Sequence, residues 1–326
     1  MEFRTVLTNS HRRDSIKHSH RILMIGSCFS DNIGNRLRSA MMQVEINPFG
    51  TVYNPASILE EVKHIISGEE IKETDLFQAN GMWNHFSFHS HYSRACKTAA
   101  LSEMNARLMQ AHNHLKQCNE VIITLGTAFV YRHKAQDMIV SNCHKLPAVE
   151  FARQMMSVAQ VGECLDEMVR LLQDFAPQAR VIFTVSPIRH VSDGLEQNQL
   201  SKSVLRVAVG EIVTRYPKRC EYFPAYEIMM DDLRDYRFYA ADMVHPSDVA
   251  VEYIWNTFKA TYFDDNTAQT ASRCERISKR LAHRPMTDNR EAIEKFNNET
   301  KKIITNLVKE NPYLCNIHHL KDYIAP

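Results

Sequence analysis

The chain has 326 residues, and its 39 Lys and Arg against 38 Asp and Glu leave a net charge of +1. Hydrophobic residues make up 44% and charged residues 24%, which is typical of a globular protein and excludes disorder as its main property. A balanced charge gives no electrostatic attraction to nucleic acid or to an anionic membrane, so we expect neither as a partner.

Targeting signals and cofactor motifs are not evident in the sequence. No apolar run approaches the ~20 residues that cross a bilayer, and the polar stretch from His11 to His20 is unlike a secretory signal. The eight cysteines show no CxxC spacing, so we expect reduced thiols in a cytoplasmic protein. With no P-loop and no GxGxxG motif, we expect no cofactor.

Five short apolar runs predict strands, and most segments between them have helical spacing. The expected strands are 21–25, 44–46, 121–126, 180–185 and 221–223. The expected helices are 30–41, 55–67, 102–118, 161–175, 201–216 and 248–262. This alternation predicts an α/β fold, a three-layer α/β/α sandwich around a mostly parallel five-stranded sheet.

Two segments depart from the alternation. Residues 70–98 hold aromatic and histidine side chains without a clean period, and we expect an irregular excursion over the sheet. From residue 265 the chain becomes strongly charged, with a helical stretch over 290–309. We therefore expect a main domain over residues 1–264 and a C-terminal helical extension over 265–326 that packs outside the sheet.

Four segments carry residues that can support chemistry. Three of them follow predicted strands, at the edge where α/β sheets place their sites, and the fourth comes after the last predicted strand. Residues 26–30, Gly-Ser-Cys-Phe-Ser, place a hydroxyl and a thiol at the start of a helix, where N–H groups stabilise negative charge. Asp242 precedes His245 by three residues, a spacing in which a carboxylate can orient an imidazole base. Segments 47–55 and 125–128 can present N–H groups to an oxyanion.

The order of these segments, with the nucleophile first and Asp-x-x-His last, resembles the SGNH/GDSL hydrolase superfamily. More narrowly, residues 26–30 resemble the motif that names the GSCFA family. Residues 47–55, 142–145, 186–190 and 236–245 are similar to the same family, and the resemblance covers about residues 20–262.

The resemblance implies a hydrolase that acts on an ester or thioester, in a small-molecule or glycan-linked acyl substrate, through a covalent acyl-enzyme. An acyltransferase would use the same residues, with a second substrate in place of water. A non-catalytic ligand-binding module on the same scaffold is the third hypothesis.

Two registers of the superfamily motif Gly-Asp-Ser fit the chain. In one register Ser27 takes the place of the Asp and Cys28 is the nucleophile. In the other, shifted by one residue, Ser27 is the nucleophile. In both registers we expect His245 as the base and Asp242 as the residue that orients its ring.

The third superfamily block, Gly-x-Asn-Asp, is incomplete, because Ala128 stands where the Asn that binds the oxyanion belongs. We expect the N–H groups of Cys28 and Gly50 to hold the oxyanion, with an amide from elsewhere replacing the missing one. The candidates for binding the oxyanion or the substrate are Gly50, Asn54, Gly126, Thr127, Asn142 and Arg189. Arg189 would contact an anionic group on the substrate.

Three histidines, His85, His89 and His91, have a spacing that can suit a metal ion. Trp83, Phe86 and Phe88 crowd the same segment, so we interpret it as the wall or lid of a pocket and expect no metal.

Overall fold

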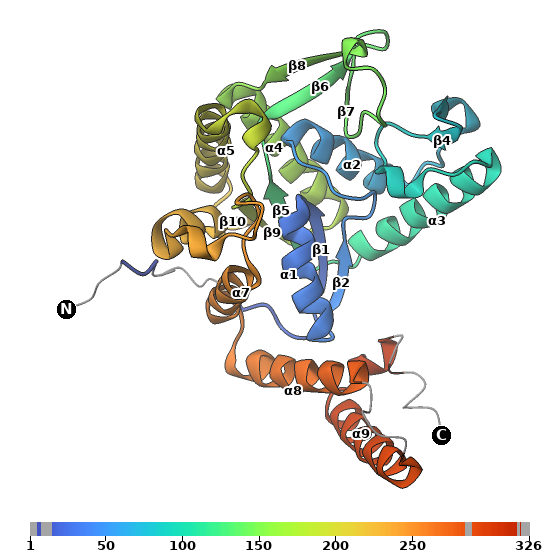
Figure 1. The fold of residues 1–326 in the computed structure, drawn as a ribbon, viewed down its shortest axis with the longest axis vertical. Helices are drawn as coiled ribbons and strands as arrows, with labels where there is room; N and C mark the ends of the chain where they lie inside the picture. Colours follow the sequence, from blue (N-terminus) through green and yellow to red (C-terminus); the bar gives the residue numbers. More distant parts are fainter. Residues whose placement is uncertain (1–4, 8–14, 284–288, 318–319, 321–326) are drawn as a thin grey trace.

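The structure is a computed structural model that describes residues 5–7, 15–283, 289–317 and 320 (Figure 1). The expectation about a secretory signal falls partly on residues 1–4 and 8–14, which lie outside the described residues. Parts of the expected C-terminal extension, at 284–288, 318–319 and 321–326, lie outside them as well.

A five-stranded parallel sheet forms the middle of the molecule, with the strand order β10-β9-β5-β1-β2 (Figure 1). Its strands are β1 (Arg21–Gly26), β2 (Gln43–Ile46), β5 (Glu120–Leu125), β9 (Arg180–Val185) and β10 (Cys220–Tyr222). All five coincide with the predicted apolar runs to within a residue or two. The α/β/α fold class is therefore confirmed.

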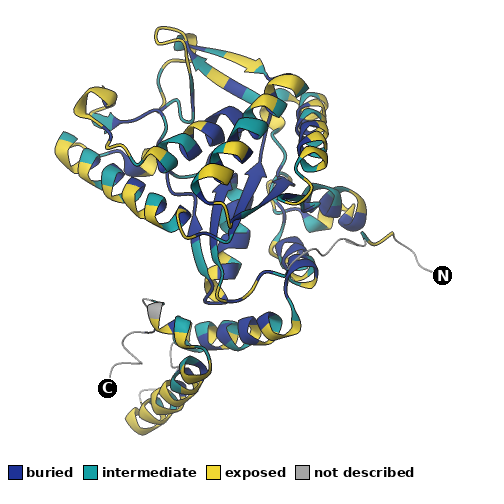
Figure 2. Ribbon diagram, turned by 180° about the vertical axis from the view of Figure 1, so that it is seen from behind, coloured by how far each residue is buried: buried dark blue, intermediate teal, exposed yellow. Residues whose placement is uncertain are grey.

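Helices cover both faces of this sheet, because successive strand side chains point to opposite sides. Leu23 and Ile25 of β1 pack into a core with α2, α3, α4 and α5, whereas Ile22 and Met24 pack with α1 and α7. The helices are α1 (Cys28–Ser39), α2 (Pro55–Ser67), α3 (Lys97–Leu115), α4 (Val158–Phe175), α5 (Leu195–Arg215) and α7 (Asp248–Tyr262). Figure 2 shows the strands of the sheet as buried between these layers.

Several helix starts differ from the prediction. Helix α3 begins at Lys97, so Ser102 lies inside the helix instead of capping it. Helix α5 begins at Leu195 after Gly194, which has φ +84° and makes no side-chain cap. Both starts lack the capping side chain that a sequence prediction uses to place a boundary.

Two small antiparallel sheets were not expected. The excursion over 70–98 contains the hairpin β3 (Phe77–Ala79) and β4 (Met82–Asn84). A second sheet has the order β7-β6-β8, formed by β6 (Phe129–His133), β7 (Met138–Val140) and β8 (Phe151–Met155). These strands are short and partly exposed, so they lack the continuous apolar run that marks a central strand.

The C-terminal part contains α8 (Asp265–Ala282) and α9 (Arg290–Glu310), which lie beyond one end of the sheet (Figure 1). They form a small core with Met41, at the end of α1, and Ser278 Oγ donates to Ser39 O at 2.7 Å. Much of α9 is exposed (Figure 2). That residues 1–264 form a separate domain remains a prediction.

The remaining elements are short helical turns. These are Glu73–Asp75, Ser90–Tyr92, Ala148–Glu150, Val191–Asp193, α6 (Ala225–Glu227), Ile228–Leu233, Tyr236–Phe238 and Pro312–Asn316. Among the helices within the described ranges, none has the length and apolar character that a membrane span requires.

Candidate active site

The turn between β1 and α1 needs a glycine. Gly26 has φ +146°, and a Cβ built on it would lie 2.2 Å from Thr124 O of the neighbouring strand β5. The next residue, Ser27, donates its N–H to the same Thr124 O at 3.2 Å. Strand β1 can therefore run close against β5 and turn directly into the helix that carries the candidate nucleophile.

The hydroxyl of Ser27 has a structural function. Ser27 is the N-cap of α1, and its Oγ accepts a hydrogen bond from Phe29 N at 3.3 Å. The same Oγ donates to Ser186 Oγ at 3.0 Å, and Ser27 is only 1% exposed. The Ser27 hydroxyl is therefore buried and already engaged in two hydrogen bonds, which favours the register with Cys28 as the nucleophile.

Cys28 is the first residue of α1 and is partly exposed. Its Sγ lies 3.7 Å from the Oη of Tyr53, in the loop that follows β2. We find no hydrogen-bond acceptor for the Cys28 N–H among the described residues, as expected at the first turn of a helix. Of the two candidate nucleophiles, Cys28 is partly exposed, whereas Ser27 is buried.

Asp242 and His245 form the expected pair. Nδ1 of His245 lies 2.6 Å from Oδ2 of Asp242, and Oδ1 of Asp242 accepts the backbone N–H groups of Val244 at 2.9 Å and His245 at 3.0 Å. These backbone bonds, followed by the ring, lower the pKa of Asp242 to about 2. Met243, with φ +58°, makes the tight turn that folds the carboxylate back onto the ring.

The Asp242–His245 loop lies at the carboxyl edge of the sheet. Arg189, in the segment that follows β9, donates its N–H to Val244 O at 3.2 Å. Val244 and Cys28 pack at the margin of the same apolar core. Within the described residues, however, no hydrogen bond joins Cys28 to His245, so the two lie at one edge without direct contact.

Tyr53 and His190 lie at the same edge of the sheet, and Tyr53 contacts Cys28. The ring of Tyr53 packs edge-on against His190, with centroids 5.7 Å apart. Burial, followed by the charge of Lys202, lowers the pKa of His190 to about 4, and the charge of His245 acts in the same direction. The series Cys28, Tyr53, His190 and His245 therefore extends along this edge of the sheet.

Most of the N–H groups expected to hold an oxyanion already have acceptors. Gly50 donates to Asn47 O at 2.8 Å, while Gly126 and Thr127 both donate to Tyr53 O, at 2.7 and 3.0 Å. Gly50 lies in the loop after β2, whereas Gly126 and Thr127 follow β5, so these N–H groups hold two separate segments in place.

The side-chain oxygens of the two expected amides are engaged. Oδ1 of Asn54 caps α2 by accepting Ser57 N at 2.8 Å. Oδ1 of Asn142 accepts His144 N at 2.8 Å, in a loop whose backbone bonds to Phe86 O. These bonds leave the Nδ2 donors unused, and the role of Asn54 or Asn142 in binding an oxyanion stays a prediction.

Arg189 lies beside the site. Its guanidinium packs over the rings of Tyr239 at 4.1 Å and Tyr236 at 5.2 Å. The same residue lines a hollow of about 410 Å³ together with Gln199 and Tyr226. The predicted role for Arg189 in substrate binding stays a prediction, with a cavity in which it can act.

Two residues that support the site were missed by the sequence analysis. Asn47, with φ +43°, accepts Gly26 N at 2.9 Å and donates to Asp31 Oδ1 at 2.8 Å, so it fixes the loop after β2 to the nucleophile turn.

Lys202 is 1% exposed and donates to Gly126 O at 2.6 Å and to Ser186 O at 2.7 Å. Burial lowers the pKa of Lys202 to about 7. Asn47 lies in the segment 47–55 that the sequence had indicated, whereas no sequence motif indicated Lys202.

The histidines of the excursion contact neighbouring backbone and rings. Nδ1 of His85 accepts Ser87 N, and Nδ1 of His89 accepts His91 N. His85 also packs edge-on against Phe88. Throughout the part of the chain that the structure describes, no three His, Cys, Asp or Glu side chains gather as a metal site would require.

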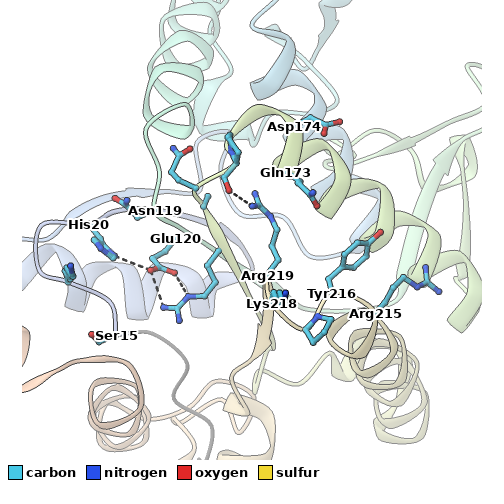
Figure 3. Close-up of a pocket in the computed structure, with 16 residues that line it drawn as sticks. Ser15, His20, Asn119, Glu120, Gln173, Asp174, Arg215, Tyr216, Lys218 and Arg219 are labelled. Carbon is cyan, nitrogen blue, oxygen red and sulfur yellow. Dashed lines mark hydrogen bonds and ion pairs between the residues drawn. The ribbon is translucent and has the colours of Figure 1, made fainter.

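A hollow of about 1150 Å³ lies at the opposite end of the sheet, beside the amino ends of β5 and β9 (Figure 3). Its polar groups pair with one another. Glu120 accepts Arg180 Nε at 2.8 Å, and Arg219 donates to the last carbonyls of α4, at Leu172 and Ala176. We therefore place the candidate site at the carboxyl edge, not in this hollow.

An α/β/α protein with a thiol at the first strand–helix turn and an Asp-x-x-His loop at the same edge has the framework that the sequence predicted. The chain belongs to the GSCFA family, whose model matches residues 21–258. Among curated proteins, none matches the chain in sequence.

Two solved structures are similar in outline. One is described as a candidate platelet activating factor from Streptococcus pneumonia, with 12% identity, a TM-score of 0.42, and 75% of this chain and 85% of that chain covered. The other is a carbohydrate esterase family 2 enzyme with a carbohydrate binding domain from Corynascus thermopiles (Myceliophthora fergusii). It has 12% identity, a TM-score of 0.37, and 78% of this chain and 68% of that chain covered.

Proposed function

We propose that the protein is a hydrolase of esters or thioesters that works through an acyl-enzyme on Cys28. The observation that carries the proposal is the placement of the Cys28 thiol, at the N-terminus of α1, on the sheet edge that also holds the Asp242–His245 pair. The N–H groups at a helix N-terminus stabilise negative charge that develops where the sulfur attacks.

In the proposed first step, the sulfur of Cys28 attacks the acyl carbonyl carbon. The C–S bond forms, the π electrons move to the carbonyl oxygen, and Nε2 of His245 takes the thiol proton. When the carbonyl re-forms, the bond to the leaving alcohol or thiol breaks, and His245 returns the proton to the leaving group. Water then attacks the thioester by the same sequence, with His245 as base, and releases the acid.

Asp242 would set the tautomer of His245. Its carboxylate accepts the Nδ1–H at 2.6 Å, which leaves Nε2 without a proton and able to act as a base. Among the described residues no hydrogen bond engages Nε2 of His245, and its side chain is half exposed. An approach of the Asp242–His245 loop to Cys28 on substrate binding would complete the pair, because catalytic hydrogen bonds often tighten only in the substrate complex.

The test is to treat the protein with p-nitrophenyl acetate and to locate the acetyl group by peptide mass spectrometry. We expect a burst of p-nitrophenol and acetyl on Cys28. Both should disappear in Cys28→Ala, and both should slow by on the order of 10³-fold in His245→Ala. An acetyl group found only on Ser27, or full turnover by Cys28→Ala, would contradict the proposal.

Alkylation by iodoacetamide gives a second, independent measurement with an internal reference. Cys96 is exposed, and hydrogen bonds from Thr98 and the local backbone lower its pKa, so it should react without help from the site. If His245 activates Cys28, then His245→Ala should slow alkylation of Cys28 and leave that of Cys96 unchanged.

A further inference from the structure

We propose that the hydroxyl of Tyr53 is the side-chain donor of the oxyanion hole, in place of the amide that is missing at Ala128. The inference rests on the proposed function, because an oxyanion forms only if Cys28 attacks an acyl carbonyl. It assigns a catalytic function to a residue that the sequence analysis did not select.

The position of the Tyr53 hydroxyl fits this function. Oη lies 3.7 Å from Sγ of Cys28. The oxyanion sits on the carbon that is bonded to sulfur, so it lies two bonds beyond Sγ. A donor at this distance from the sulfur can therefore come within about 2.7–3.1 Å of the oxyanion, the range in which such donors act.

Tyr53 is held in place on three sides. Its carbonyl accepts the N–H groups of Gly126 and Thr127 at 2.7 and 3.0 Å, which fixes its backbone to the end of β5. Its ring packs edge-on against His190, and its hydroxyl donates to Thr51 Oγ1 at 3.4 Å. A donor that is positioned before the reaction costs no reorganisation in the transition state.

The phenol keeps its proton in this environment. Burial is the largest cause that raises the pKa of Tyr53, and the neighbouring Cys28 raises it further. The hydroxyl would donate a hydrogen bond to the oxyanion and keep its own proton. The proton transfers of the reaction would be made by His245 alone. The long bond to Thr51 is weak, so little is lost when the hydroxyl turns to the oxyanion.

The alternatives sought in the sequence are less suitable. The N–H groups of Gly50, Gly126 and Thr127 have acceptors of their own, and Ala128, which is fully buried, donates to Ser201 Oγ at 2.8 Å. The Tyr53 hydroxyl lies within hydrogen-bond distance of Sγ, and the Cys28 N–H has no acceptor among the described residues. Together they would form a hole with one backbone and one side-chain donor.

The test compares Tyr53→Phe with Tyr131→Phe. The second variant is a matched control, because it removes a hydroxyl from an exposed position of strand β6. We expect kcat for p-nitrophenyl acetate to fall about 10²- to 10³-fold in Tyr53→Phe, with KM little changed, and to stay at the wild-type value in Tyr131→Phe. A kcat for Tyr53→Phe within threefold of wild type would overturn the inference.

A second measurement separates oxyanion binding from any effect on the thiol. An aldehyde such as propanal forms a tetrahedral hemithioacetal on Cys28, whose oxygen needs a donor, whereas alkylation by iodoacetamide forms no oxyanion. In Tyr53→Phe we expect the inhibition constant of propanal to rise at least tenfold, with the alkylation rate of Cys28 unchanged. Equal losses in both assays would show that Tyr53 acts on the thiol, and would overturn the inference.

These outcomes are distinct from a failure of the proposed function. If Cys28→Ala turns over the ester as fast as wild type, the acyl-enzyme proposal fails, whatever Tyr53→Phe does. If Cys28→Ala is inactive while Tyr53→Phe is fully active, the function stands and only the inference about Tyr53 fails.

Discussion

Nδ1 of His245 lies 2.6 Å from Oδ2 of Asp242, while the other carboxylate oxygen accepts two backbone N–H groups of the same loop. The carboxylate is thus fixed by the backbone before it meets the ring. This arrangement orients the imidazole although the side chains are exposed, at 45% for His245 and 50% for Asp242.

The first prediction concerns Asp242→Asn. The amide can donate to Nδ1, so it would favour the tautomer that has its proton on Nε2, and His245 would lose its function as a base. We expect kcat for p-nitrophenyl acetate to fall by on the order of 10²-fold or more. The melting temperature should change little. Asp137→Asn, at an exposed turn, is the control and should keep full activity.

The pH dependence follows from the same pair. Because the pKa of Asp242 is lowered to about 2, its carboxylate is ionised at every pH where the protein would be assayed. The profile of kcat/KM should therefore show no step near the ordinary pKa of an Asp, in wild type and in Asp137→Asn alike. A limb that titrates near the ordinary pKa of an Asp would show that Asp242 is not held by the loop.

The second prediction separates the two registers of the nucleophile motif. Ser27→Ala removes the cap of α1 and should lower the free energy of unfolding by about 1 kcal/mol, as Ser157→Ala should at the capped start of α4. Activity per folded molecule should stay within tenfold of wild type in Ser27→Ala and be lost in Cys28→Ala. The reverse pattern would favour the serine register.

The central sheet could be predicted because parallel strands are buried on both faces. Strand β5, for example, is buried at every position and appears in the sequence as the continuous run 121–126. The sheet of β6, β7 and β8 could not be predicted in this way, since Tyr131 and Met138 remain exposed and interrupt any apolar pattern.

The site was predictable where its chemistry is local in sequence. The contact between Asp242 and His245 spans three residues, and the spacing alone indicated it. The bond that buries Ser27 Oγ against Ser186 spans 159 residues, and the bond from Lys202 to Gly126 O spans 76 residues. Such contacts depend on the strand order, which no local pattern specifies.

The third prediction concerns Glu61, a buried carboxyl that accepts Phe49 N in the loop after β2. Burial raises its pKa from 4.5 to about 8. Between these values the folded protein holds a proton that the unfolded chain releases, so stability falls as pH rises, with a slope of up to about 1.4 kcal/mol per pH unit.

Urea unfolding at pH 5 and at pH 8 measures this slope. The loss of stability from pH 5 to pH 8 should be clearly smaller in Glu61→Gln than in wild type. Glu60→Gln, which changes an exposed neighbour on the same helix, should behave as wild type does. If wild type and Glu61→Gln lose the same stability between the two pH values, Glu61 is ionised in the folded protein.

The last prediction tests whether the nucleophile turn requires its glycine. In Gly26→Ala the new Cβ would lie 2.2 Å from Thr124 O, and φ +146° is a conformation that alanine rarely adopts. Backbone atoms of β5 cannot yield as a flexible side chain would, so we expect a loss of at least about 2–3 kcal/mol in the free energy of unfolding. Cys28 would move with the turn, so activity should fall as well.

Gly162→Ala is the matched control. Gly162 lies in helix α4, and a Cβ built on it meets no atom within 4 Å. Alanine is the better helix former, so this variant should gain up to about 1 kcal/mol and keep its activity. If Gly26→Ala and Gly162→Ala have the same unfolding midpoint in urea, then β1 and β5 are not packed closely enough to need Gly26, and the position of Cys28 at the sheet edge does not depend on that turn.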